Sequence, residues 1–98
     1  MNSSQSLEYI VGWLSKRCDG LWEHHNGIVL QTTDNPGWMI RLTSKDEFPR
    51  LNENVPVDVS TENCEGLISN DGLAMFSTSL ENLLHDVVKL LKIRENEN

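Results

Sequence analysis

The sequence predicts an α+β domain with an N-terminal helix, an antiparallel sheet of about four strands and a C-terminal helix, both helices packed on one face of the sheet. Apolar residues recur at helical spacing near the two ends of the chain, whereas the middle contains β-branched runs separated by turn residues. The length fits a single domain over residues 1–98, in which we expect residues 95–98 to fray.

The first helix is predicted from about Ser4 to Cys18. Its apolar residues have the spacing of one helical face: Leu7, Ile10, Val11, Leu14 and Cys18. A serine is expected to cap its start, and the candidates are Ser3, Ser4 and Ser6. Asp19-Gly20 supplies a turn whose glycine can adopt the left-handed conformation that ends helices. This arrangement places the Cys18 thiol on the apolar face of the helix.

A β-hairpin is predicted over residues 28–33 and 38–43, because both segments are rich in β-branched and other strand-favouring side chains. Between them, Pro36 presets φ for one central turn position and Gly37 tolerates positive φ at the next, so a type II turn is expected. The second strand has a face that we expect to be covered, which carries Trp38, Ile40 and Leu42.

The remaining strands are predicted at residues 55–59 and 73–76, with residues 67–68 as a candidate short strand between them. Pro56 favours an edge position for the first of these strands or a place at its start, because proline cannot donate a hydrogen bond to a neighbouring strand. Asn70-Asp71-Gly72 favours a turn before the last strand. We expect residues 44–54 to form an irregular polar connection, and the strands to follow one another as a meander.

The C-terminal helix is predicted to begin with Thr78 and Glu81, which have the spacing of a capping box. Its apolar stripe follows: Leu80, Leu83, Leu84, Val87, Val88 and Leu91. Basic residues near the end of this helix complement the helix dipole. Each predicted helix therefore has an apolar face that must be covered, and one side of the sheet can cover both.

The chain is acidic, with 15 aspartate and glutamate residues against eight lysine and arginine residues and a formal net charge of −7. This charge disfavours binding to a phosphate backbone, so nucleic acid is not expected as a ligand, and it favours attraction to a basic protein. The sequence contains no apolar run long enough for a membrane span and no export signal, so we expect a cytoplasmic protein with no membrane partner. Cys18 and Cys64 are then expected to be free thiols.

Residues 18–26 contain a thiol, two carboxylates and two imidazoles, and this cluster is the strongest candidate for chemistry. A structural zinc site needs four ligands in paired spacings, which Cys18 with the adjacent His24 and His25 does not supply. The glycines are scattered at turns and form no phosphate-binding loop. We therefore expect no enzymatic activity, no cofactor and no metal. The alternatives are a small hydrolase or metal-dependent enzyme using Cys18 and His24, and a regulatory adaptor that self-associates.

A set of residues in the first part of the chain resembles the immunity protein 53 family of bacterial polymorphic toxin systems. The resemblance covers residues 1–42 and is carried by Trp13, Cys18-Asp19-Gly20, Trp22-Glu23-His24, Gly27-Ile28 and Thr33-Asp34-Asn35-Pro36-Gly37-Trp38. It implies an antitoxin that binds and neutralises a cognate toxin protein in the cell that produces it. It implies no reaction.

The partner-binding residues are expected among acidic side chains in the two polar loop regions: Asp46, Glu47, Glu62, Glu65 and Asp71. The helical stripes and the inner sheet face are committed to the core, whereas loops tolerate variation and remain accessible. A second candidate surface consists of Trp22, Glu23 and His24. We expect these residues to occlude the basic surface of a nuclease-type toxin, and we expect the protein to be a monomer or a weak homodimer.

Overall fold

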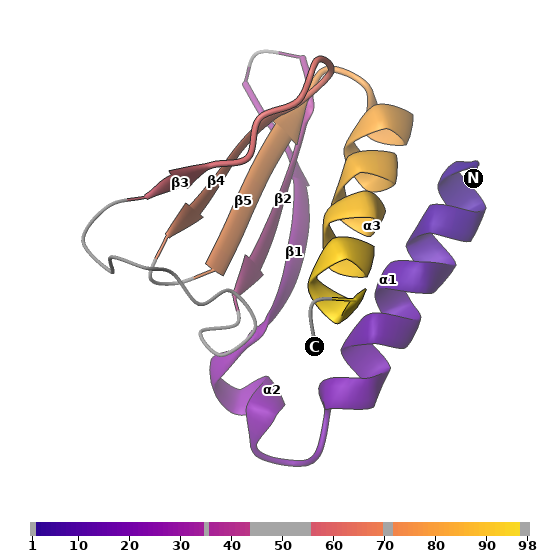
Figure 1. The fold of residues 1–98 in the computed structure, drawn as a ribbon, viewed down its shortest axis with the longest axis vertical. Helices are drawn as coiled ribbons and strands as arrows, with labels where there is room; N and C mark the ends of the chain where they lie inside the picture. Colours follow the sequence, from indigo (N-terminus) through magenta and orange to yellow (C-terminus); the bar gives the residue numbers. More distant parts are fainter. Residues whose placement is uncertain (1, 35, 44–55, 70–71, 97–98) are drawn as a thin grey trace.

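The computed structural model describes residues 2–34, 36–43, 56–69 and 72–96, and it confirms the α+β fold class (Figure 1). The elements, in chain order, are α1 (Ser3–Arg17), α2 (Trp22–His25), β1 (Gly27–Thr32), β2 (Trp38–Thr43), β3 (Val57–Asp58), β4 (Glu65–Ser69), β5 (Gly72–Ser77) and α3 (Leu80–Asn96). Helices α1 and α3 lie on the same side of a five-stranded antiparallel sheet (Figure 1).

The sheet has the strand order β1-β2-β5-β4-β3, so the predicted meander is wrong. Strand β2 pairs with β5, and the register places Ile40 opposite Met75 and Leu42 opposite Leu73. These four side chains are all buried, because each of the two strands presents one apolar face to the helices. The two-residue strand β3 follows Pro56 and lies at the edge, as predicted.

The core lies between the sheet and α3, which is the more deeply buried of the two long helices. Leu83, Val87 and Leu91 of α3 are fully buried, and they face the covered side of the sheet together with neighbouring apolar residues. Helix α1 packs along α3 and runs in the same direction (Figure 1). The predicted apolar stripe of the C-terminal helix is therefore confirmed.

The buried face of α1 differs from the predicted one. Leu7 and Val11 are 45% and 51% exposed, and Cys18 is also exposed. The buried residues of α1 are Ser6, Ile10 and Trp13. Trp13 is the largest apolar side chain of this helix, and burying it in the core beside Trp22 removes more apolar surface from water than burying Leu7 would.

The end of α1 is fixed by aromatic and cationic contacts. The Trp13 and Trp22 rings meet edge to face with centroids 6.1 Å apart. The Arg17 guanidinium lies 3.7 Å from the centroid of the Trp13 ring, and Arg17 Nη1 donates to the Trp13 carbonyl oxygen at 3.0 Å. Gly20 has the predicted left-handed backbone, with φ of 96°, in the turn that follows.

The helix starts are set by residues next to the predicted ones. Asn2 caps α1: its Oδ1 accepts from Gln5 N at 2.8 Å, and Gln5 Oε1 accepts from Asn2 N at 3.0 Å. At α3, Ser79 Oγ accepts from Asn82 N at 3.2 Å, so Ser79 takes the capping role predicted for Thr78. Each correction is a shift along the chain of a few residues at most, because several adjacent polar side chains can satisfy the free N–H groups of a first helical turn.

The turn between β1 and β2 needs its glycine for a different reason from the predicted one. Gly37 does not have a positive φ, so the type II turn is wrong. Thr33 N donates to the Gly37 carbonyl oxygen at 3.1 Å. A Cβ at Gly37 would lie 2.8 Å from Cε2 of Phe76 on β5. Glycine is required because the backbone passes close to an aromatic ring.

Candidate partner-binding surface

One face of the sheet is not covered by a helix of the described chain (Figure 1). Ile40 and Leu42 point toward the helices, so the alternation of a strand directs Met39 and Arg41 to the other side. We call this side the open face. The strand register places its side chains in two rows, Gln31-Met39-Phe76-Glu65 and Val29-Arg41-Ala74-Leu67-Asp58.

A hollow of about 380 Å³ lies on the open face over β4 and β5. Apolar side chains that line it come from three strands: Met39, Leu67, Ala74 and Phe76. Ala74 is the smallest of them and lies between Arg41 and Leu67 in its row, so it leaves space that a larger side chain would fill. Leu67 is 45% exposed, which leaves apolar surface available to a partner.

Two carboxylates line the same hollow, Asp58 from β3 and Glu65 from β4. Asp58 Oδ1 accepts from Ser60 N at 2.8 Å, and hydrogen bonds from the Ser60 side chain and backbone lower the pKa of Asp58. Asp58 is therefore ionised at neutral pH. Glu65 lies opposite Phe76 on the open face and is exposed.

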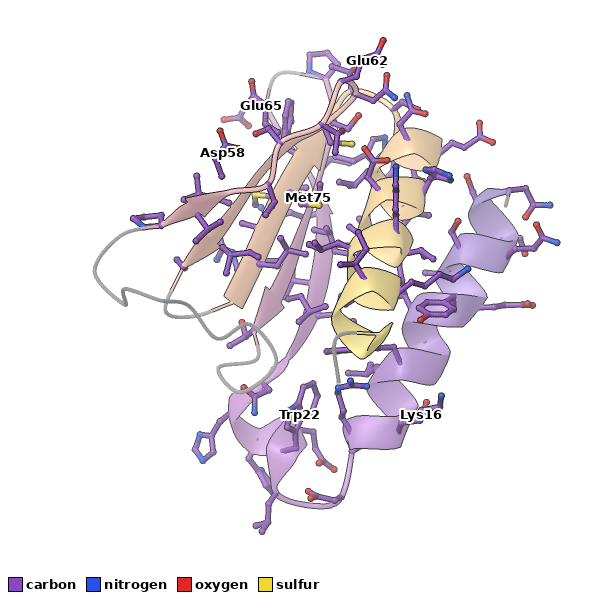
Figure 2. All side chains as sticks on the ribbon, in the orientation of Figure 1. Lys16, Trp22, Asp58, Glu62, Glu65 and Met75 are labelled. Carbon is purple, nitrogen blue, oxygen red and sulfur yellow. The ribbon has the colours of Figure 1, made fainter. Side chains whose placement is uncertain are left out.

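Glu62 lies near Glu65, in a turn that is tied to α3. The Thr61 amide donates to the Cys64 carbonyl oxygen at 2.8 Å, and Thr61 Oγ1 donates to Asp86 Oδ2 at 2.5 Å. Figure 2 shows Glu62, Glu65 and Asp58 at the same end of the molecule. The turn thus adds a third exposed carboxylate to this end of the molecule.

The predicted partner-binding residues that fall within the described ranges lie at two ends of the molecule. Glu62 and Glu65 are exposed at one end of the molecule, whereas Trp22 lies at the opposite end (Figure 2). The other acidic residues predicted for this role lie outside the described residues, namely Asp46, Glu47 and Asp71. The structure therefore separates the two predicted surfaces.

The second predicted surface has clear structural roles. Trp22 is half-buried against Trp13, and His24 is exposed in α2. Glu23 Oε1 accepts from Asp19 N at 3.1 Å and from Gly20 N at 3.0 Å. Backbone N–H groups of Glu23 itself, Gly20 and Asp19 lower the pKa of Glu23. This carboxylate holds the turn between α1 and α2.

Sequence reasoning missed Asp58 and the apolar floor of the hollow. Asp58 alternates with Val57 and Val59, which indicates that it faces away from them, but the alternation does not say which strand lies alongside. Met39 and Phe76 likewise belong to predicted strands, and only the pairing of β2 with β5 places them next to each other.

Asp86 of α3 contacts a cysteine and a histidine, Cys64 and His85, which are not the residues of the predicted enzymatic alternative. Asp86 hydrogen-bonds to Cys64, and its Oδ1 lies 3.2 Å from His85 Nδ1, so the imidazole contacts the carboxylate. Burial and the hydrogen bond to Asp86 raise the pKa of Cys64 to about 11. A nucleophilic cysteine needs a lowered pKa and a neighbouring base, which is the opposite of this environment.

The same carboxylate is ionised in spite of its burial. Burial alone would raise the pKa of Asp86, but hydrogen bonds from Thr61, Cys64 and His85 together lower it. In the described residues, no group of three or more histidine, cysteine, aspartate or glutamate side chains is placed to hold a metal ion. Asp86 thus joins α3 to the turn that carries Glu62.

No helix within the described ranges has both the length and the apolar character needed to cross a membrane. Exposed apolar surface rimmed by polar side chains marks interaction sites in many proteins, so the hollow is the candidate binding site on this face. The model of the immunity protein 53 family matches residues 7–69, which is more than half of the chain. The chain belongs to the immunity protein 53 family, and its role is that of an immunity protein that binds a cognate toxin. No curated protein and no solved structure matches the chain.

Proposed function

We propose that this immunity protein neutralises its cognate toxin by covering the active surface of the toxin with its acidic end, and that the toxin is a nuclease-type domain. A nuclease has to bind a polyanion, so its active surface is basic. Negative charge is supplied at one end of the molecule by Asp58, Glu62 and Glu65, and the net charge of the whole chain is −7. Opposite charge on the two surfaces speeds their encounter and disfavours wrong partners.

The observation that carries this proposal is the exposure of these carboxylates around an open sheet face. Within the described ranges, no ion pair to a lysine or arginine involves Glu62 or Glu65. Asp86 is different: it is buried and accepts hydrogen bonds from within the protein. The exposed carboxylates are therefore suited to interact with a partner, whereas the buried one stabilises the fold.

The enzymatic alternative is less well supported. It uses Cys18 and His24, and no hydrogen bond within the described residues joins these two side chains. The other thiol, Cys64, lies in surroundings that keep it protonated at neutral pH. The other alternative is a regulatory adaptor that self-associates. Sedimentation velocity of the purified protein distinguishes such an adaptor from a monomeric inhibitor.

The test uses the cognate toxin domain. Its cleavage of DNA and RNA is measured with and without the immunity protein, and association kinetics are measured at several salt concentrations. We expect inhibition at equimolar ratio and an association rate that falls with salt, because the screening length decreases from about 10 Å at 0.1 M to about 3 Å at 1 M. A toxin that cleaves neither DNA nor RNA would contradict the nuclease assignment.

Charge reversals test which end of the protein is used. Glu62→Lys and Glu65→Lys are expected to slow association, and Glu8→Lys is the matched control because Glu8 is exposed on α1, on the helical side of the molecule. If Glu8→Lys slows association as much as the other two variants, net charge rather than the acidic end drives the encounter.

A further inference from the structure

We infer that the hollow on the open face receives a long basic side chain, lysine or arginine, that projects from the toxin. This inference rests on the proposed function and adds a defined contact to it. The hollow combines an apolar floor with carboxylates on one side, and this combination matches the two parts of a basic side chain. The methylene stem packs on apolar groups while the charged head reaches a carboxylate.

The hollow is deep because Ala74 in its floor has a small side chain. This residue lies in the middle of β5, opposite Leu67 on β4 and Arg41 on β2. Phe76 and Leu67 rise beside it and contribute to the lining, so a side chain entering over Ala74 has apolar groups around its stem. The hollow holds about 380 Å³, which leaves room for one extended side chain and its backbone approach.

The charged side chains around the hollow are distributed unevenly. Asp58 and Glu65 line it on the β3–β4 side, and Ser60 N, at 2.8 Å from Asp58 Oδ1, helps to hold the Asp58 carboxylate in place. Arg41 lies on the opposite side of Ala74, outside the lining. A cation on the incoming side chain is therefore attracted toward β3 and β4 and repelled from β2, which selects one orientation.

Two other occupants fit the charges less well. A second copy of the chain carries the same net charge of −7 and would bring further carboxylates toward Asp58 and Glu65. A nucleic acid would place phosphates against the same carboxylates. A basic side chain of a protein is the occupant that satisfies both the floor and the carboxylates.

The decisive variant fills the hollow without changing charge. Ala74→Leu is expected to weaken toxin binding by about tenfold or more, mainly through faster dissociation, because it occupies the place of the incoming stem. Gln31→Leu is the matched control: it adds a leucine to the same face on β1, outside the hollow, and should change affinity by less than about threefold. Urea denaturation shows whether each variant is folded, and Ala74→Val replaces Ala74→Leu if the latter does not fold.

A double-mutant cycle identifies the partner group. Glu65→Gln is combined with replacement of each lysine and arginine on the toxin surface by alanine, and at least one pair is expected to be coupled by about threefold or more in affinity. Absence of coupling for every pair, with Ala74→Leu binding like wild type, would overturn the inference. If the wild-type protein still binds the toxin with salt-dependent association, the proposed function stands without this contact. If the wild-type protein does not bind the toxin, the proposed function itself is refuted. A dimer of the free protein that Ala74→Leu dissociates would assign the hollow to a second copy and also overturn the inference.

Discussion

Replacing Gly37 with alanine should destabilise the fold through a steric clash rather than through backbone strain. The added Cβ would lie 2.8 Å from Phe76 Cε2, 3.0 Å from Phe76 Cζ and 3.2 Å from the Ser77 carbonyl oxygen. Optimal carbon–carbon separations are about 3.5–4.0 Å, so the ring or the strand has to move. Overpacking of this kind costs about 1–3 kcal/mol. Each kcal/mol lowers the melting temperature of a domain of this size by about 4–8 °C.

The assay is urea unfolding followed by circular dichroism, in a cycle with Phe76→Leu. That substitution removes the two ring atoms nearest to the new Cβ, so Gly37→Ala should cost less in the Phe76→Leu background by at least about 0.5 kcal/mol. Gly27→Ala is the matched control, because no atom lies within 4 Å of its Cβ position and its φ is not positive. It should leave stability unchanged or raise it by about 0.4–1 kcal/mol.

Two results would refute this reasoning. The clash is excluded if Gly37→Ala has the same midpoint as wild type. Equal costs of Gly37→Ala with and without Phe76→Leu would assign the requirement for glycine to the approach of the Ser77 carbonyl oxygen rather than to the Phe76 ring.

Three further predictions concern the core and its buried polar groups. Asp86→Ala should lower the free energy of unfolding by about 1–3 kcal/mol, because it leaves Thr61 without its acceptor. Since the pKa of Asp86 is lowered in the folded state, the extra stability of the wild type should be present above the ordinary pKa of 3.8 and lost at lower pH, which unfolding curves of both proteins from pH 2 to 7 check. Cys64 should resist iodoacetamide at pH 8 in the folded protein while the exposed Cys18 reacts, and early labelling of Cys64 detected by mass spectrometry would contradict its burial. Because the pKa of Cys64 rises from 9.0 to about 11 on folding, the free energy of unfolding should decrease as pH rises from 9 to 11. Leu91→Ala should cost about 2–5 kcal/mol in thermal or urea unfolding, because Leu91 is fully buried between α3 and the sheet, and a loss below 1 kcal/mol would show that this site is not part of the core.

The acidic turn illustrates how stability and binding are connected in this protein. Glu62 is presented by a turn whose Thr61 hydroxyl is held by buried Asp86 of α3. The loss of Asp86 should therefore loosen a surface residue as well as the core. Asp86→Ala should then weaken toxin binding in the wild-type background but not in the Glu62→Lys background. That difference would show that Asp86 acts on toxin affinity through Glu62.

The sequence by itself determined the local elements. The periodic stripe of Leu83, Val87 and Leu91 predicted α3, and Pro56 predicted an edge strand, because such signals depend on neighbours a few residues apart. Residues at the start of the chain also indicated the family, whose model extends to residue 69.

The tertiary structure decided which of these surfaces are covered and which meet. Two apolar faces compete on α1, and the chain buries Trp13 rather than Leu7, because Trp22 and α3 provide partners for the larger side chain. The pairing of β2 with β5 brings Met39 beside Phe76 and creates the hollow over Ala74. Periodicity identifies the faces of an element, but the free energy gained on burial depends on what packs against each face, and that is set by residues distant in the sequence.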